Sequence, residues 1–240
     1  MKKILFILPA VFVLFSCTKW DNYAEPAAAL EGTVIDLATG QPLRTEQPNG
    51  FRVRYKEIAE EYPSAQYYYF QGKADGTFKN TKMFAATYEL TPVEGAFITP
   101  APQTVTLKDG TNPSVTFSVT PYLTISSDKI SVNTSTKTLH AEFKISQPSG
   151  SSAVPKQAFV SVTWNPNVSY YTYGTGNNKM VANGGRMTKN VGAADLDTVI
   201  SFDIDMTDMT PGHTWYVRMG RTSDKNANRA NFSDIFTFEY

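Results

Sequence analysis

Residues 139–145 read Leu-His-Ala-Glu-Phe-Lys-Ile, with an apolar side chain at every second position. Successive side chains of a β-strand point to opposite faces, so this run predicts a strand with one buried face. Similar alternation recurs along the chain, whereas the best helical pattern, at 56–62, spans only two turns before Pro63. The sequence therefore predicts an all-β protein of the sandwich type, in which turns separate many short strands.

The alternating runs fall into two groups, on either side of Pro121 and Tyr122. This boundary predicts two tandem β-sandwich domains, at 30–121 and 122–240, each close to the common domain size. Alternation also places Trp164 and Trp215 in the core of the second domain. The clearest runs are Phe51–Tyr55, Val115–Val119, Val160–Trp164, Ile200–Met206, Trp215–Met219 and Phe236–Tyr240.

The first residues predict export. Lys2 and Lys3 precede an apolar run that is too short to span a bilayer, which is the pattern of a signal peptide. The Leu-Phe-Ser-Cys sequence at 14–17 looks like a bacterial lipobox, so we expect cleavage of residues 1–16 and lipid attachment to Cys17. Residues 17–29 then form a lipidated tether, which mixes Asn, Pro and Ala without a hydrophobic period.

Charge and cysteine content narrow the possible partners. The 240 residues contain 22 basic and 22 acidic side chains, and loss of the two signal lysines leaves a net charge near −2. This balance predicts no nucleic-acid partner and offers no polybasic patch for anionic lipid, so the acyl chain must provide the membrane attachment. Cys17 is the single cysteine, which excludes a disulfide within the chain.

Two stretches resemble known β-sandwich families. Residues 30–43, together with 75–78 and 88–90, resemble the opening hairpin and the middle of carboxypeptidase-regulatory-like domains, which have a transthyretin-like fold. Residues 209–218 resemble the turn and strand that carry the tyrosine corner of immunoglobulin and fibronectin type III domains, with Tyr216 as the corner residue. One extra residue before Thr214 departs from that pattern.

The lipobox, the residues at 21–23 and 30–43 and the second sandwich, in that order, resemble the DUF3823 family of Bacteroides lipoproteins. The resemblance covers nearly the whole mature chain. It implies a lipid-anchored protein of the outer membrane, exposed at the cell surface and associated with glycan-uptake systems. It implies no established activity.

The sequence contains no catalytic signature that we can recognise, and we expect no enzyme activity, no metal and no cofactor. His140 and His213 lack the spacing of a zinc site. Asp203 and Asp205 share one strand face and are expected to be solvated, although two carboxylates could serve glycoside hydrolysis. The loop that begins at Asp224 lacks the glycine and glutamate of an EF-hand, so it predicts a hairpin loop and leaves a weak cation site open.

Two tyrosine clusters are candidate ligand-binding surfaces. Consecutive tyrosines of a strand point to both faces, so at least one ring of each cluster is expected to face outward. An outward ring can stack on a sugar or contact a protein partner, and packing at a sheet edge is the alternative. The candidate ligand-binding residues are Tyr170, Tyr171, Tyr173, Asn177, Asn178, Tyr67 and Tyr69. Thr198, within Asp197-Thr198-Val199, resembles the short acceptor pattern for O-glycosylation in this phylum.

Together these features predict a non-catalytic surface lipoprotein that is accessory to glycan binding and uptake. Such a protein would bind a glycan or a neighbouring uptake protein. A structural or assembly module of an outer-membrane complex is one alternative, and a hydrolase with its site in the cleft between the domains is another.

Overall fold

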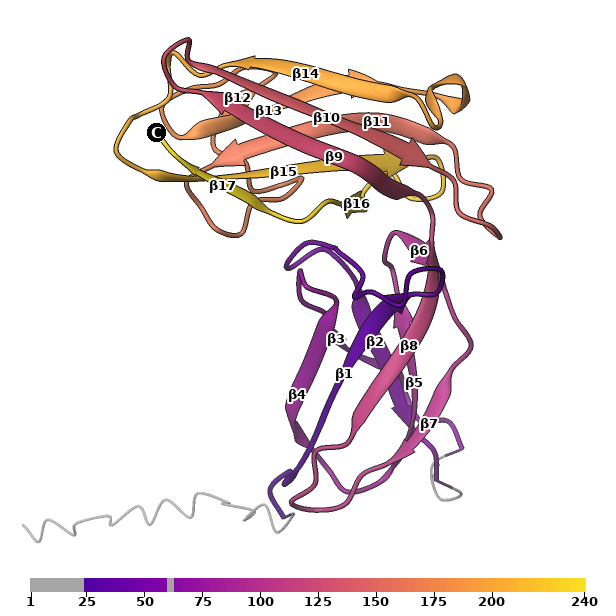
Figure 1. Ribbon diagram of the computed structural model, residues 1–240. Coiled ribbons are helices and arrows are strands. Elements are labelled where there is room, and N and C mark those ends of the chain that lie inside the picture. Colours follow the sequence, from indigo (N-terminus) through magenta and orange to yellow (C-terminus); the bar gives the residue numbers. More distant parts are fainter. Residues whose placement is uncertain (1–23, 60–62) are drawn as a thin grey trace, which may run out of the picture.

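The computed structural model describes residues 24–59 and 63–240, whose elements are strands apart from a 3-10 turn at Ala193–Asp195 (Figure 1). The all-β prediction is confirmed. At 56–62, where the sequence has its best helical pattern, Lys56 and Glu57 continue strand β2 (Arg52–Glu57). No helix in the described ranges is long and apolar enough to cross a membrane. The expected lipidation site, Cys17, lies outside these ranges.

The first half, residues 24–121, packs two four-stranded sheets face to face. Strand β1 (Ala28–Asp36) begins two residues before the predicted domain start, and it pairs antiparallel with β4 and parallel with β8. Its alternate side chains, such as Leu30 and Val34, meet Val53 and Leu90 of the facing sheet. The sheet orders are β4 (Thr77–Met83), β1, β8 (Ser114–Pro121), β6 (Phe97–Ile98) and β3 (Tyr68–Gln71), β2, β5 (Thr87–Val93), β7 (Gln103–Thr106).

The second half, residues 122–240, packs a three-stranded sheet against a larger one. Its core joins Leu139 and Phe143 of the first sheet to Val160 and Trp215 of the second. The smaller sheet has the order β14 (Val199–Asp205), β10 (Thr138–Ser146), β9 (Thr124–Asn133). The larger has the order β12 (Gly176–Asn177), β13 (Gly184–Asn190), β11 (Pro155–Thr163), β15 (Thr214–Ser223), β16 (Ala230–Phe232), and β17 (Phe236–Glu239) also pairs with β15.

Two aromatic positions in the second half differ from the sequence-based expectation. Trp164 follows the end of β11 and is 39% exposed, resting on His213 and Trp215 at ring-centroid distances of 4.5 and 5.6 Å. The strand therefore ends before the alternation does. Tyr216 lies on the face opposite the core residues of β15 and is only half-buried. A tyrosine corner needs a ring on the core face, so Tyr216 does not form one.

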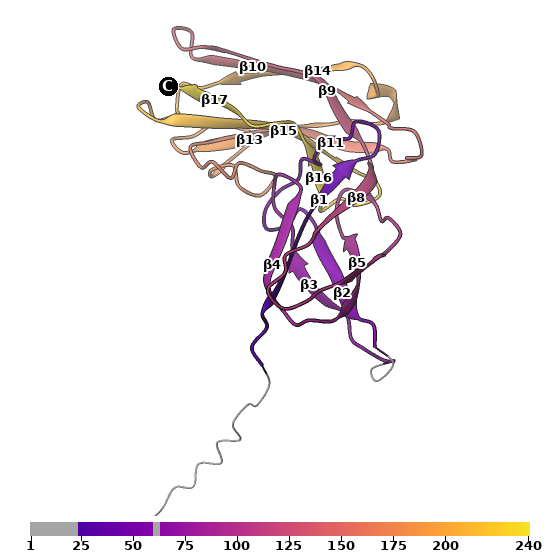
Figure 2. The ribbon, with the colours of Figure 1, turned by 60° about the horizontal axis from the view of Figure 1, so that its bottom comes forward.

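The second sandwich lies across one end of the first, and the chain passes between them from β8 into β9 (Figures 1 and 2). Two polar side chains of the second half reach carbonyl groups of the turn between β5 and β6. Asn231 donates from Nδ2 to the Ala96 carbonyl over 2.9 Å, and Arg229 donates from Nε to the Glu94 carbonyl over 2.7 Å. These bonds hold the loop end of the first half against strand β16.

Candidate functional site

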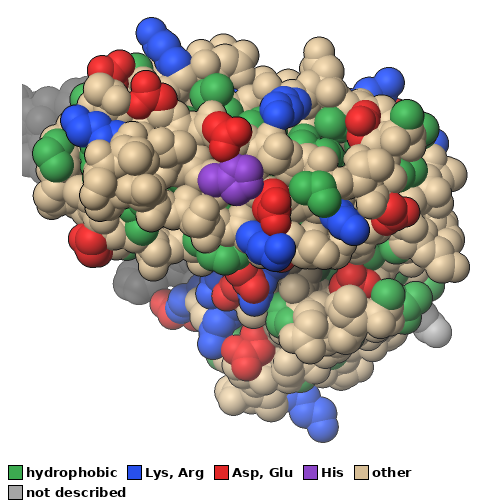
Figure 3. Space-filling view, turned by 45° about the horizontal axis from the view of Figure 1, so that its top comes forward, with side chains coloured by type: hydrophobic (Ala, Val, Ile, Leu, Met, Phe, Trp, Pro, Cys, Tyr) green, Lys and Arg blue, Asp and Glu red, His purple; other side chains and the backbone are tan. Residues whose placement is uncertain are grey.

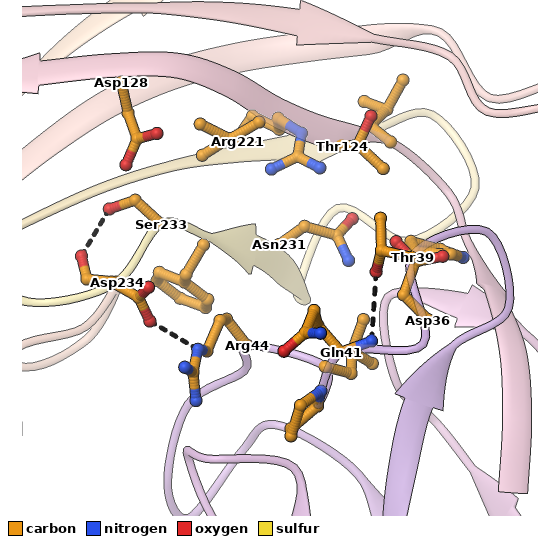
Figure 4. A pocket seen from close by; sticks show the side chains of 16 residues that line it. Asp36, Thr39, Gln41, Arg44, Thr124, Asp128, Arg221, Asn231, Ser233 and Asp234 are labelled. Carbon is orange, nitrogen blue, oxygen red and sulfur yellow. Dashed lines mark hydrogen bonds and ion pairs between the residues drawn. The ribbon is translucent and has the colours of Figure 1, made fainter.

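A cavity of about 300 Å³ opens where the two halves meet, and we call it the interface cavity (Figure 4). The first half contributes the loop that follows β1, and the second half contributes parts of β9, β15 and β16. Its lining residues are Asp36, Thr39, Gln41, Pro42, Leu43, Arg44, Pro121, Leu123, Thr124, Ile125, Asp128, Arg221, Asn231, Phe232, Ser233 and Asp234. Side chains from both halves therefore shape one site, which neither half contains alone.

The topology explains why the cavity opens at this place. Strands β9 and β16 are edge strands of the two sheets of the second sandwich, so the space between them is not closed by a further strand. Strand β9 also has a bulge. Its pairing with β10 shifts register between Glu142 and Lys144 of β10, and Ser127 of β9 adopts a φ of 51° at this point. Bulges redirect neighbouring side chains, and the next residue, Asp128, lines the cavity.

The cavity lining is rich in hydrogen-bonding groups, several of which are already oriented. The Asp36 carboxylate accepts a 2.8 Å bond from the Ala38 amide, and Asp234 forms an ion pair with Arg44 at 2.5 Å. Asn231 donates one of its side-chain amide hydrogens to the Ala96 carbonyl. Because these hydrogen bonds and this ion pair fix the side chains, the cavity presents a preformed set of donors and acceptors.

Glu46 is a buried acid in the contact between the halves, outside the cavity lining. Its side chain is 2% exposed, and both carboxylate oxygens are buried without a hydrogen bond within the described residues. Burial raises the pKa of Glu46, and the nearby Ser169, the Tyr170 amide and Arg229 only partly oppose that shift. The contact between the halves therefore favours the protonated acid.

The 170s tyrosines are mainly held by packing. The Arg186 guanidinium lies 4.2 Å from the centre of the Tyr170 ring and 4.4 Å from that of Tyr173, and it donates a 2.6 Å bond to the Tyr170 carbonyl. The Tyr170 hydroxyl bonds Gln157. Tyr171, at 50% exposure, is the ring of this cluster that is open to solvent.

The side chains of Asn177 and Asn178, which follow the tyrosines, differ in whether they are already hydrogen-bonded. The Asn178 side-chain oxygen accepts bonds from the Thr188 amide and hydroxyl at 3.1 and 2.6 Å, so it fixes the loop. Asn177 pairs through its backbone with Arg186 in the short parallel contact of β12 and β13, and its side chain is exposed. Of the predicted cluster, Tyr171 and Asn177 remain available to a ligand.

Tyr67 and Tyr69 are exposed on the outer face of the β3-β2-β5-β7 sheet, at its β3 edge. Arg54 lies 4.5 Å from the Tyr67 ring centre, and Arg52 lies 4.2 Å from that of Tyr69. Cations next to aromatic rings stabilise such a face by about 0.5–1 kcal/mol per contact. The structure does not bring this cluster to the 170s tyrosines or to the interface cavity.

The remaining predicted positions lie at the surface. The His140 Nδ1 lies 2.6 Å from the Asp203 carboxylate, which raises the pKa of His140. Figure 3 looks onto this side and shows acidic and basic side chains intermingled. Asp224 accepts a 2.7 Å bond from the Val154 amide, and Thr198 is exposed in a turn. Within residues 24–59 and 63–240 no group of three acidic, histidine or cysteine side chains is placed to hold a metal.

The sequence analysis named none of the cavity residues as site residues, and Arg221 is the one for which a signal was available. In β15, Trp215, Val217 and Met219 share the core face, and Arg221 is the next residue on that face. The available signal was an arginine at a position where the alternation predicts an apolar side chain. It marks a buried polar group that needs a physical explanation.

The fold thus defines an all-β protein of two sandwiches with a polar cavity between them. The model of the DUF3823 N-terminal domain, described as a protein of unknown function, matches residues 28–120. The chain therefore carries the N-terminal domain of the DUF3823 family, which confirms the resemblance seen in the sequence. A search of curated proteins finds no match.

Several solved structures share the fold of almost the whole chain. A DUF3823 family protein from Bacteroides uniformis ATCC 8492 is 19% identical, with 89% of this chain and 99% of that chain covered and a TM-score of 0.70. One from Parabacteroides merdae ATCC 43184 is 20% identical, with 90% and 100% covered and a TM-score of 0.68. A third, again from Bacteroides uniformis ATCC 8492, is described as a "putative carbohydrate binding protein"; it is 20% identical, with 90% and 100% covered and a TM-score of 0.69.

The raised pKa of Glu46 makes a prediction about stability and pH. A folded-state pKa above the ordinary value stabilises the fold at low pH, and that contribution is lost as the pH rises through the folded pKa. Glu46→Gln should therefore raise the melting temperature near pH 8 by roughly 2–4 °C, equivalent to about 1 kcal/mol. This gain should shrink as the pH falls to about 4.

Thermal melts followed by circular dichroism at both pH values check this prediction. The exposed Glu25→Gln variant removes the same charge at a site outside the contact and should leave the melting temperature unchanged. A Glu46→Gln gain that is equal at both pH values would contradict the assignment of the effect to the Glu46 proton.

Proposed function

We propose that the chain is a non-catalytic lipoprotein of the cell surface that binds a glycan in the interface cavity. The observation that carries this proposal is the lining, which brings carboxylates, amides, hydroxyls and guanidinium groups from both halves to one small space. Sugars present many hydroxyl groups, each of which both donates and accepts hydrogen bonds. A site with fixed donors and acceptors suits that chemistry.

The same cavity also offers apolar surface. Leu43, Leu123 and Phe232 belong to the lining beside the polar groups. A sugar ring has C–H faces that such side chains can cover, while its edge hydroxyls meet the polar groups. The mixture of a few oriented polar groups with apolar walls is typical of small-molecule sites. The carbohydrate-binding description of a protein with the same fold agrees with this proposal.

Binding without hydrolysis fits the placement of the acids. A glycosidase needs one carboxylic acid that stays protonated beside a second carboxylate. Burial raises the pKa of Glu46, but this residue does not line the cavity. Three carboxylates do line it, and two of them are engaged: Asp234 is held by Arg44 in an ion pair, and Asp36 accepts a bond from the Ala38 amide. We therefore prefer a binding role to a hydrolase in the cleft.

A protein partner is a second candidate, and the exposed tyrosines in and just before β3 favour it. Tyr67, Tyr68 and Tyr69 are each more than 40% exposed, and β3 is an edge strand. Aromatic side chains are enriched at protein interfaces. A neighbouring uptake protein, or the assembly of an outer-membrane complex, would use this face, and the interface cavity would stay free for the glycan.

Anchoring is proposed to depend on Cys17 alone. Replacing Cys17 with Ala should release the protein from membranes, since a single acyl-modified residue provides the attachment. The measurement is the distribution of the protein between the membrane pellet and the supernatant after a high-salt wash. Continued pelleting of Cys17→Ala with outer membranes would overturn the lipoprotein assignment.

Glycan binding can be tested with a soluble form that begins at Thr18. Array screening should identify a bound glycan, and calorimetry should then show weaker binding by Gln41→Ala in the first half and by Asp128→Ala in the second. Each variant loses one or two hydrogen bonds, which corresponds to a loss of affinity of about 3- to 10-fold. A loss in both variants is expected only of a site shared by the halves.

Two exposed residues outside the cavity provide matched controls, Gln66→Ala and Asp109→Ala. Both should bind like the parent chain. The proposal fails if the parent binds no glycan, or if the cavity variants bind as tightly as the controls do. Release of reducing sugar from the bound glycan would instead support a hydrolase.

A further inference from the structure

Arg221 occupies an interior position at the end of strand β15. It lies directly opposite Ala158 on one neighbouring strand and Asn231 on the other. Ala158 belongs to the core of the second sandwich, so Arg221 faces the space between the two sheets. At this end of the sandwich that space is the interface cavity, and Figure 4 shows the guanidinium pointing into it.

The Arg221 side chain is buried but has few partners. It is 1% exposed, and within the described residues its Nε and Nη1 atoms are buried without a hydrogen bond. Burial lowers the pKa of Arg221 well below its ordinary value, and only the charge of Asp36 opposes that shift. A buried charge without partners destabilises a fold. A ligand in the cavity would supply the missing acceptors.

Arg218 shows that burial on β15 does not by itself leave an arginine without partners. Three residues earlier on β15, Arg218 is also buried, at 2% exposure. It donates from Nε to the Ser233 carbonyl over 3.1 Å and lies 4.3 Å from the centre of the Phe232 ring. The strand therefore carries one buried arginine with structural partners and one whose donors face a cavity.

The charges around Arg221 select the kind of ligand. Three carboxylates, from Asp36, Asp128 and Asp234, line the cavity together with two guanidinium groups, from Arg44 and Arg221, so the lining has a net charge near −1. An anionic ligand would pair with Arg221 but would lie among these carboxylates, and like charges repel. A hydroxyl group can accept from the guanidinium and donate to a carboxylate at the same time.

Resting on the proposed glycan-binding function, we propose that Arg221 is the specificity-determining residue of the interface cavity, and that with Asp36 it binds neighbouring hydroxyl groups of a neutral sugar. The fork of guanidinium N–H groups presents parallel donors to two adjacent hydroxyl oxygens. Asp36, held by the Ala38 amide, accepts from one of those hydroxyls.

This role predicts opposite effects of one substitution on stability and on binding. Arg221→Met removes a buried unpaired charge and puts an unbranched apolar side chain in its place. The melting temperature should therefore stay the same or rise. Loss of charge-assisted hydrogen bonds should weaken binding by about 10- to 100-fold. If Arg221 had only a structural role, its replacement would instead lower the melting temperature.

The probes are the neutral glycan that binds most tightly on an array and its counterpart with a uronic acid in place of the neutral sugar. Calorimetry with the parent, Arg221→Met and Arg186→Met should show binding loss in Arg221→Met alone. Arg186, which packs between Tyr170 and Tyr173 outside the cavity, is the matched arginine control. Its variant should melt earlier and bind normally.

Asp36→Asn is a second variant that tests the charge argument without removing Arg221. It should weaken binding of the neutral glycan and reduce the preference for that glycan over its uronic acid counterpart. Tighter binding of the uronic acid form by the parent would overturn the neutral-sugar proposal and leave glycan binding intact. Parent-like affinity of Arg221→Met would overturn the role of Arg221. Absence of any glycan binding would overturn the proposed function itself.

Discussion

The contact between the loop end of the first sandwich and the β16 edge of the second is the constraint on which the rest of the structure depends. Side chains of Asn231 and Arg229 donate to the carbonyls of Ala96 and Glu94, and each bond can form only if the two halves keep one orientation. Leaving the buried Asn231 amide or its acceptor unpaired costs about 1–3 kcal/mol. Domains joined by a short link often move relative to one another, and these bonds oppose that motion.

The cavity and its chemistry follow from this orientation. The loop after β1 closes the open end of the second sandwich, where β9 and β16 leave the gap between the two sheets uncovered. Closure buries Arg221 among polar groups that do not satisfy it, and the same contact buries Glu46, whose neighbours only partly offset the cost of burying its charge. Both residues reduce stability in the free protein. In our proposal, a ligand that enters the cavity supplies the partners that Arg221 lacks. The buried Glu46 makes the contact between the halves sensitive to pH.

The sequence predicted what depends on local pattern. Alternation at Leu139–Ile145 and Trp215–Met219 gave the strands and their buried faces, and the end of β8 lies at Pro121 where the pattern changes. It did not predict that Trp164 leaves the core or that Arg186 occupies the space between two tyrosine rings, because both depend on loop paths and contacts between distant segments. The sequence analysis named the cleft between the domains only as an alternative place for a hydrolase site, and it missed the residues that line the interface cavity for the same reason. The position of Arg221 on the core face of β15 was a visible sign.

A distance measurement between the halves tests the account most directly. A form that begins at Thr18 has no cysteine, so Lys108→Cys and Asp208→Cys, both at exposed positions, introduce one spin label in each half. Pulsed electron resonance should give a single narrow distance distribution in the free protein, unchanged when a cavity glycan is added. A broad or two-peaked distribution that narrows only with the glycan would contradict a preformed cavity held by the contact between the sandwiches.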